Sequence, residues 1–171
     1  MFITVIDNSD EAGSLAYTRL KCFSSETLLT MSSTQEMVTK VLMKSIGKKI
    51  ARLSIIDHGS PYHFTIGNDQ FDVQKYKANS AWPKFFLLRG RFHDYGYVHL
   101  FNCKVGRSEL LIKALAKALQ VPVVAHTENY NGVMDTMNGK YVQAFPNGKV
   151  EEEKRKPTIF NQMTNLAQGK I

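Results

Sequence analysis

Cys103 and His58 are the two residues whose types and positions are best suited to covalent chemistry. His58 directly follows an apolar run at residues 50–57, and Cys103 directly follows a second run at 97–102. Both runs predict strands of a parallel sheet, in which catalytic groups gather just beyond the carboxyl ends of the strands. If the two strands are neighbours, about 4.8 Å apart, the thiol and the imidazole emerge side by side. An imidazole in that position can act as a base or stabilise a thiolate, which is the minimum equipment for acyl transfer.

The residues around this pair fit the same chemistry. Gly59 lets the main chain approach a substrate closely, and its N–H, together with that of Cys103, is expected to hold the oxyanion of a tetrahedral intermediate. The segment 103–106 leads into a helix predicted from Ser108. The positive end of that helix would point toward the thiol and stabilise the thiolate.

Two residues at the end of the next predicted strand, His126 and Glu128, are expected to line the pocket that selects the substrate side chain. The Glu128 carboxylate would pair with an Arg or Lys of the substrate, and a plain surface role is an equal alternative. Asp57 could orient the ring of His58, although neighbouring side chains of a strand point to opposite faces. A zinc site formed by His58, Cys103 and His126 is a further alternative, but no predicted helix carries the usual paired ligands.

The remaining histidines and the second cysteine have simpler interpretations. His99 is expected inside a strand, and His63 and His93 are expected on the surface. Cys22 lies in a region without clear secondary structure and is predicted to be a structural thiol. The two cysteines match neither a zinc knuckle nor a CxxC redox pair, so a reducing compartment is the simpler setting.

The elements that must position these residues alternate between short β-branched runs and helices, which predicts an α/β chain with a parallel sheet and helices on its faces. Ser33 to Glu36 has the form of a capping box, and helical spacing continues behind it up to Gly47. The amphipathic segment 108–119 predicts a second helix. Further strands are expected at 2–7, 27–31 and 121–126, an edge strand at 140–145, a hairpin arm at 62–66, an aromatic-rich and partly helical connection at 69–95, and a last helix at 157–169.

Length, composition and charge limit the class of protein. With 171 residues, 43% of them hydrophobic, the chain is expected to form a single domain over residues 1–171. The net charge of +7 would suit a nucleic-acid binder, but the basic residues are scattered and no RNA- or DNA-binding motif accompanies them. The first apolar run stops at Asp7, too short for a signal peptide or a membrane span. A cytoplasmic protein is therefore expected, with delivery into another cell by a secretion system left open.

Two motifs resemble those of the caspase-like (clan CD) cysteine peptidases, a group that includes caspases, gingipains, clostripain and separase. They are Leu53-Ser-Ile-Ile-Asp-His-Gly59 and Val98-His-Leu-Phe-Asn-Cys-Lys-Val-Gly106, each an apolar strand that ends in a residue of the catalytic type. The similarity covers about residues 50–132 and looks closest to bacterial caspase-like domains in which HGSP precedes a short hairpin. The caspase pentapeptide around the cysteine is absent, because Asn102 and Lys104 replace its residues.

This resemblance implies a three-layer α/β/α caspase-like fold with a mostly parallel central sheet. It also implies a cysteine endopeptidase in which Cys103 attacks the scissile carbonyl, His58 handles the proton to the leaving amine, and Gly59 helps to form the oxyanion hole. Such an enzyme needs no cofactor and acts on a protein or peptide substrate, with no nucleic acid or membrane as partner. A bacterial toxin, effector or regulatory protease would fit. The alternative is a catalytically inactive caspase-like module that binds a protein partner and keeps Cys103 as a core thiol.

Overall fold

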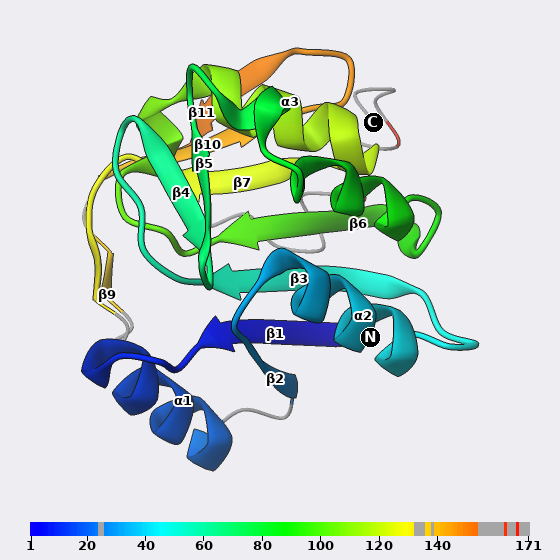
Figure 1. Ribbon diagram of the computed structural model, residues 1–171. Coiled ribbons are helices and arrows are strands. Elements are labelled where there is room, and N and C mark those ends of the chain that lie inside the picture. Colours follow the sequence, from blue (N-terminus) through cyan, green and yellow to red (C-terminus); the bar gives the residue numbers. More distant parts are fainter. Residues whose placement is uncertain (24–25, 132–135, 138, 154–162, 164–166, 168–171) are drawn as a thin grey trace.

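A seven-stranded sheet in the order β11-β10-β7-β6-β3-β1-β2 forms the centre of the computed structural model (Figure 1). The structure describes residues 1–171 except 24–25, 132–135, 138, 154–162, 164–166 and 168–171. The strands of this sheet are β1 (Phe2–Asp7), β2 (Thr27–Met31), β3 (Ile50–Ile56), β6 (Phe92–Leu100), β7 (Val123–His126), β10 (Tyr141–Ala144) and β11 (Val150–Glu153). The neighbouring pairs β2–β1, β1–β3, β3–β6 and β6–β7 are parallel. The pairs β7–β10 and β10–β11 are antiparallel. The predicted α/β class with a mostly parallel sheet is therefore confirmed.

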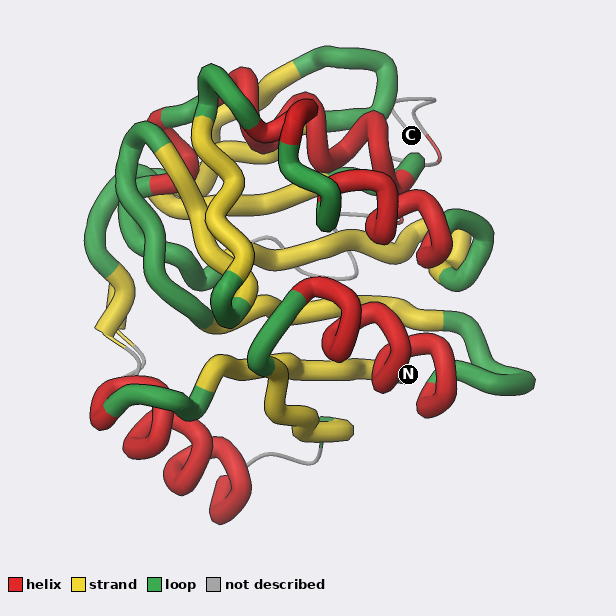
Figure 2. The backbone as a smooth tube through the Cα atoms, viewed as in Figure 1, coloured by secondary structure: helices red, strands yellow, loops and turns green. Residues whose placement is uncertain are grey.

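Core residues lie on both faces of this sheet. The larger apolar cluster joins strand residues such as Ile55 and Leu100 to α2 (Thr34–Lys44), α3 (Glu109–Leu119) and the 3-10 helix η2 (Trp82–Leu88), and Figure 2 shows these helices along the near side of the sheet. Ile56 and Phe101, the next residues along the same strands, belong to a smaller cluster with Ala16 of α1 (Glu11–Phe23). Because successive side chains of a strand point to opposite faces, α1 packs on the face opposite to α2 and α3.

Helix α2 begins at the predicted cap, with one difference in its detail. Ser33 accepts the N–H of Glu36 at 3.2 Å, as an N-cap residue does. The Glu36 carboxylate accepts the N–H of Ser32 at 2.8 Å, one residue before the partner expected in a capping box. The helix ends at Lys44, short of the predicted limit at Gly47.

A small hairpin lies beside the carboxyl ends of β3 and β6 (Figure 1). It consists of β4 (His63–Ile66) and β5 (Asp69–Asp72), and its rings Phe64 and Phe71 stack 4.9 Å apart within the larger core. The turn contains Gly67 at φ 57°, where a Cβ atom would lie 2.1 Å from the carbonyl oxygen of Ser32. Only glycine fits this turn, which locks the hairpin against the start of α2.

Residues 11–23 form helix α1, whereas the sequence showed no clear secondary structure around Cys22. Gly13, Ser14 and Thr18 have low helix propensity, so the sequence carries a weak helical signal there. The segment folds as a helix because tertiary packing of Ala16 overrides that propensity. Cys22 lies in this helix and is exposed, so the predictions that it lies outside regular structure and is a structural thiol are wrong.

Three further departures lie in the second half of the chain. Strand β10 is not the edge strand that the sequence predicted, because β11 pairs beyond it. The sequence did not predict β11, because its glutamates 151–153 have low strand propensity. The connection 69–95 is partly helical, as predicted, with the short 3-10 helices η1 (Tyr76–Ala78) and η2, but it starts with β5, and β6 already begins at Phe92. A separate pair, β8 (Tyr130–Asn131) and β9 (Thr136–Met137), follows β7. The predicted last helix at 157–169 lies almost entirely outside the described residues.

Candidate active site

The ends of β3 and β6 meet in the arrangement that the sequence predicted. The two strands are parallel neighbours, and the Cα partners Ser54↔His99 and Ile55↔Leu100 share one constant offset along the chain. The Phe101 N–H donates to the carbonyl of Ile55 at 2.8 Å, which extends the pairing past the last strand residue. Continued by three more residues, the same register sets His58 opposite Cys103.

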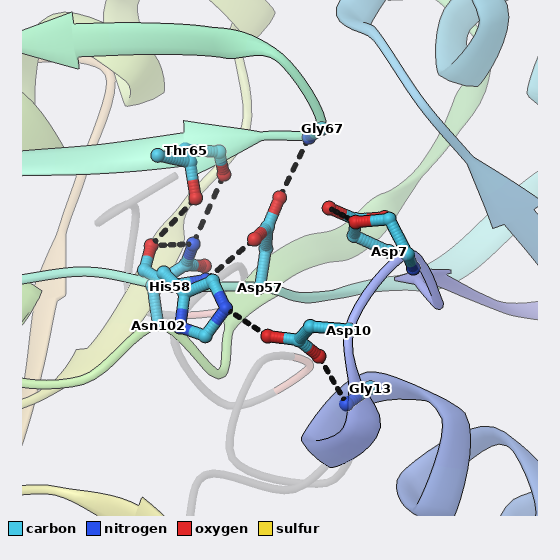
Figure 3. A network of polar contacts seen from close by, with 9 residues as sticks. Asp7, Asp10, Gly13, Asp57, His58, Thr65, Gly67 and Asn102 are labelled. Carbon is cyan, nitrogen blue, oxygen red and sulfur yellow. Dashed lines mark hydrogen bonds and ion pairs between the residues drawn. The ribbon is translucent and has the colours of Figure 1, made fainter.

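The direction of each side chain at this edge follows the alternation of a strand (Figure 3). Asp57 and Asn102 reach the hairpin, on the side of the larger core, through hydrogen bonds to Gly67 and Thr65. The ring of His58, one residue after Asp57, points to the opposite side, where α1 lies, and meets Asp10. Cys103 follows Asn102 at the start of a turn beyond β6, and a thiol that faces the imidazole stays a prediction.

Asp10 is the partner of the His58 ring. Its Oδ2 lies 2.5 Å from Nε2 of His58, and the two side chains are 42% and 67% exposed. The other carboxylate oxygen accepts the N–H of Gly13 at 2.7 Å, and the Asp10 carbonyl accepts the N–H of Ser14, so Asp10 also caps the start of α1. The Gly13 N–H, followed by His58, holds the pKa of the Asp10 carboxyl below its usual value. Asp10 therefore stays ionised beside the imidazole.

The main chain of His58 is fixed by three hydrogen bonds to one atom. Its carbonyl oxygen accepts from the N–H of Thr65 at 3.0 Å, from Oγ1 of Thr65 at 3.1 Å and from Nδ2 of Asn102 at 2.7 Å. The same Nδ2 donates to the Thr65 carbonyl at 3.1 Å, and Asn102 is fully buried. The amide of Asn102 thus ties the end of β6 to both the histidine and the hairpin.

The carboxylate of Asp57 binds main-chain groups, not the imidazole. It accepts the N–H of His58 at 2.6 Å and the N–H of Gly67 at 2.7 Å. Burial raises the pKa of this carboxyl, and the N–H groups of His58 and Gly67 oppose that shift. The ring is oriented by Asp10, and Asp57 holds the loop between β3 and the hairpin.

Gly59 is packed tightly between this loop and the residues around Cys103. A Cβ atom at position 59 would lie 2.6 Å from Cγ2 of Val105, 2.8 Å from Cβ of Asn102 and 2.9 Å from the carbonyl oxygen of Cys103. Gly59 forms an antiparallel bridge with Phe64. In the described part of the chain its N–H has no hydrogen-bond partner.

Cys103 is partly exposed and begins a tight turn. Lys104 takes the left-handed conformation at φ 59°, and its N–H donates to the carbonyl of Glu128 at 3.1 Å. A Cβ atom on Gly106 would lie 2.6 Å from the main chain of His126, so this turn packs directly on the end of β7. The 3-10 helix η3 (Val105–Arg107) stands between the thiol and α3.

Of the two predicted substrate-binding residues, His126 is buried and Glu128 lies near the surface. His126 is 1% exposed, and its Nε2 lies 2.7 Å from Nε2 of the buried His99. Glu128 lies near the surface, where its carboxylate forms an ion pair with Arg107. A basic substrate side chain would compete with Arg107 for that carboxylate. A substrate contact of either residue stays a prediction.

The other histidines lie near their expected positions. His99 is a buried residue of β6, as predicted. His63 and His93 are partly exposed; Nδ1 of His63 lies 3.0 Å from Oγ of Ser60, and the ring of His93 stacks on Tyr95 at 4.8 Å. His93 lies at the opposite end of β6 from the site, whereas His63 begins β4 of the hairpin beside it and bonds Ser60.

Among the residues that the structure describes, no group of three or more His, Cys, Asp or Glu side chains could hold a metal ion. Within the same residues, no helix is long and apolar enough to cross a membrane. Comparison of the chain with models of known protein families, with curated proteins and with solved structures finds no match.

Proposed function

We propose that the protein is a cysteine endopeptidase that uses His58 and Cys103 as a catalytic dyad. The observation that carries this proposal is that β3 and β6 are parallel neighbours, with one register from Arg52↔Tyr97 to Ile55↔Leu100, and that His58 and Cys103 each follow shortly after the end of one of them. The contact between His58 and Asp10 supports it, because a carboxylate on a ring nitrogen is the arrangement that orients a catalytic base.

The contacts of the His58 ring assign a task to each of its nitrogens. Asp10 accepts the proton on Nε2, so Nδ1 is the nitrogen left to take the proton of the Cys103 thiol. The thiolate sulfur attacks the carbonyl carbon of the scissile peptide, and His58 returns the proton to the leaving amine. Water then hydrolyses the thioester, which releases the acid and restores the thiol. In this proposal the N–H groups of Gly59 and Cys103 donate to the oxyanion.

The order of the sheet agrees with the resemblance to caspase-like peptidases. That resemblance calls for helices on both faces of a mostly parallel sheet, with the histidine and the cysteine after adjacent strands. The two core clusters and the adjacency of β3 and β6 are compatible with such a three-layer α/β/α arrangement. The proposed substrates are proteins or peptides.

The experiment compares Cys103→Ala with Cys22→Ala, using a set of fluorogenic peptides that covers all residue types before the cleaved bond. Cys103→Ala should keep a Tm within about 5 °C of the parent, because the thiol is small, yet lose all turnover. Cys22→Ala should keep its turnover, because that thiol is exposed near the end of α1 and does not follow a strand of the sheet. Full turnover in folded Cys103→Ala would refute the dyad.

A second measurement needs no substrate. In the Cys22→Ala background, iodoacetamide can alkylate only Cys103. The rate of alkylation should fall when His58 is replaced by Ala, because the imidazole no longer stabilises the thiolate. A slow rate that is the same with and without His58 would point instead to a catalytically inactive module with a structural thiol.

A further inference from the structure

A groove with a volume of about 370 Å³ lies between the 3-10 helices η1 and η2 and the second half of α3. Its floor is formed by the nearly buried rings of Tyr76 and Trp82. On the α3 side it is lined by Ala114 and Ala118, whose short side chains leave room between the helices. The groove lies on the sheet face opposite α1, about 12 Å along α3 from the end nearest Cys103.

Three cations surround this groove: Lys77, Arg89 and Lys117. No carboxylate lines it, and none of the three forms an ion pair with any described residue. Arg89 is held in place, because its Nε donates to the carbonyl of Ala118 at 2.7 Å and its guanidinium carbon lies 4.5 Å from the centre of the Phe86 ring. The groove therefore presents positive charge, fixed at Arg89, that no described carboxylate neutralises.

An exposed apolar side chain adjoins these cations. Phe86, which lines the groove beside Arg89, is 42% exposed. A ligand that fits must therefore bring both carboxylates and a bulky apolar side chain. A nucleic-acid strand fits less well, because Trp82 offers no open ring face for base stacking and Arg89 already covers a face of Phe86.

We propose that this groove is a docking site for an acidic peptide segment of another protein, with an apolar side chain inserted against Ala114 and the flanking carboxylates bound by Lys77, Arg89 and Lys117. The charge complementarity of these unpaired cations identifies the partner as acidic. The site is separate from the dyad and does not depend on peptidase activity.

The test is fluorescence anisotropy with a labelled peptide that has a central Phe flanked by Asp and Glu residues. Lys117→Glu and Ala114→Gln should each weaken binding at least about fivefold, through charge reversal and through filling of the groove respectively. Lys48→Glu is the matched control, because it changes the net charge equally at an exposed residue that does not line this groove. Lys48→Glu should bind the peptide with an affinity within about twofold of that of the parent protein.

Three outcomes would overturn the proposal. One is equal weakening by Lys48→Glu, which would mean attraction by net charge alone. Another is equal affinity for a peptide with Asn and Gln in place of its acidic residues. The third is a single-stranded oligonucleotide that binds more tightly than the peptide and loses its affinity with the same two substitutions. Far-ultraviolet circular dichroism checks that each variant is folded.

Discussion

Asp10 joins the His58 ring to the first turn of α1: its Oδ2 lies 2.5 Å from Nε2 of His58, while its Oδ1 accepts the N–H of Gly13 at 2.7 Å. The carboxylate is ionised over the whole neutral range, because these contacts lower the pKa of Asp10. The orientation of the imidazole and the capping of the helix therefore depend on one side chain.

Asp10→Asn separates these two roles. Asparagine is an equally good N-cap residue, so the free energy of unfolding should change by less than about 1 kcal/mol. Turnover should fall about tenfold or more, because a neutral amide neither fixes the Nε2–H tautomer nor stabilises the protonated ring. Peptide cleavage and urea denaturation measure the two effects. Asp7→Asn is the control, because Asp7 bonds Ser9 at the same edge of the sheet and should keep its turnover.

Asn102→Ala removes the amide that binds the carbonyls of His58 and Thr65. The loss of hydrogen bonds to buried groups should cost about 1–3 kcal/mol in the free energy of unfolding, and peptide turnover should also fall because the histidine loses an anchor. Asn79→Ala is the matched control, since the Asn79 amide also bonds a main-chain carbonyl, that of Gln70, away from the site. Equal turnover in the two variants would show that Asn102 has no positioning role.

Gly67→Ala tests the turn that locks the hairpin. The substitution should destabilise the protein by more than about 2 kcal/mol, because the residue has φ 57° and its new Cβ would lie 2.1 Å from the Ser32 carbonyl oxygen. Gly148→Ala isolates the conformational part, because Gly148 has φ 89° with no atom within 4 Å of a new Cβ. It should cost only about 1 kcal/mol. Similar values in urea denaturation would mean that packing against Ser32 contributes little.

Glu36→Gln tests the electrostatic anchor at the start of α2. The ion pair with Lys40, followed by the hydrogen bonds from Ser32, lowers the pKa of Glu36 to about 2. A lowered carboxyl pKa stabilises the fold above the ordinary value of 4.5, and this contribution is lost as the pH falls toward 2. At neutral pH the parent should therefore have a higher Tm than the variant. The corresponding difference in the free energy of unfolding should be less than about 1 kcal/mol, because the ion pair is exposed. The difference should shrink below pH 4.5, and a constant difference would contradict the assignment.

The sequence predicted the two strands that precede His58 and Cys103 because their signal is local: each is a mostly apolar run that ends in a polar residue. No local pattern in the sequence indicated Asp10 as the partner of His58, because their contact depends on β1 lying beside β3, a pairing between distant segments. The position of Asp10 three residues after β1 was the available signal, since ends of adjacent parallel strands share one edge.

Other departures arise from interactions that no local pattern carries. The burial of His126 depends on His99, a residue of the neighbouring strand, and the three glutamates of β11 resemble a solvated loop until β10 supplies their hydrogen-bond partners. In the sequence, Asn102 stands out only because it differs from the caspase motif. Its role depends on the hairpin folding back over the ends of β3 and β6.

The bond from the Gly13 amide to Asp10 makes that amide a natural reporter of the site. The hydrogen of the Gly13 amide can exchange with solvent only when the Asp10 carboxylate no longer accepts it. The same carboxylate contacts the ring of His58. Exchange at one backbone position in α1 therefore records how often the Asp10 carboxylate leaves the start of the helix. A compound that bound at the sheet edge and kept Asp10 in place would slow this exchange, so ligand screening by amide exchange is possible before any substrate is known.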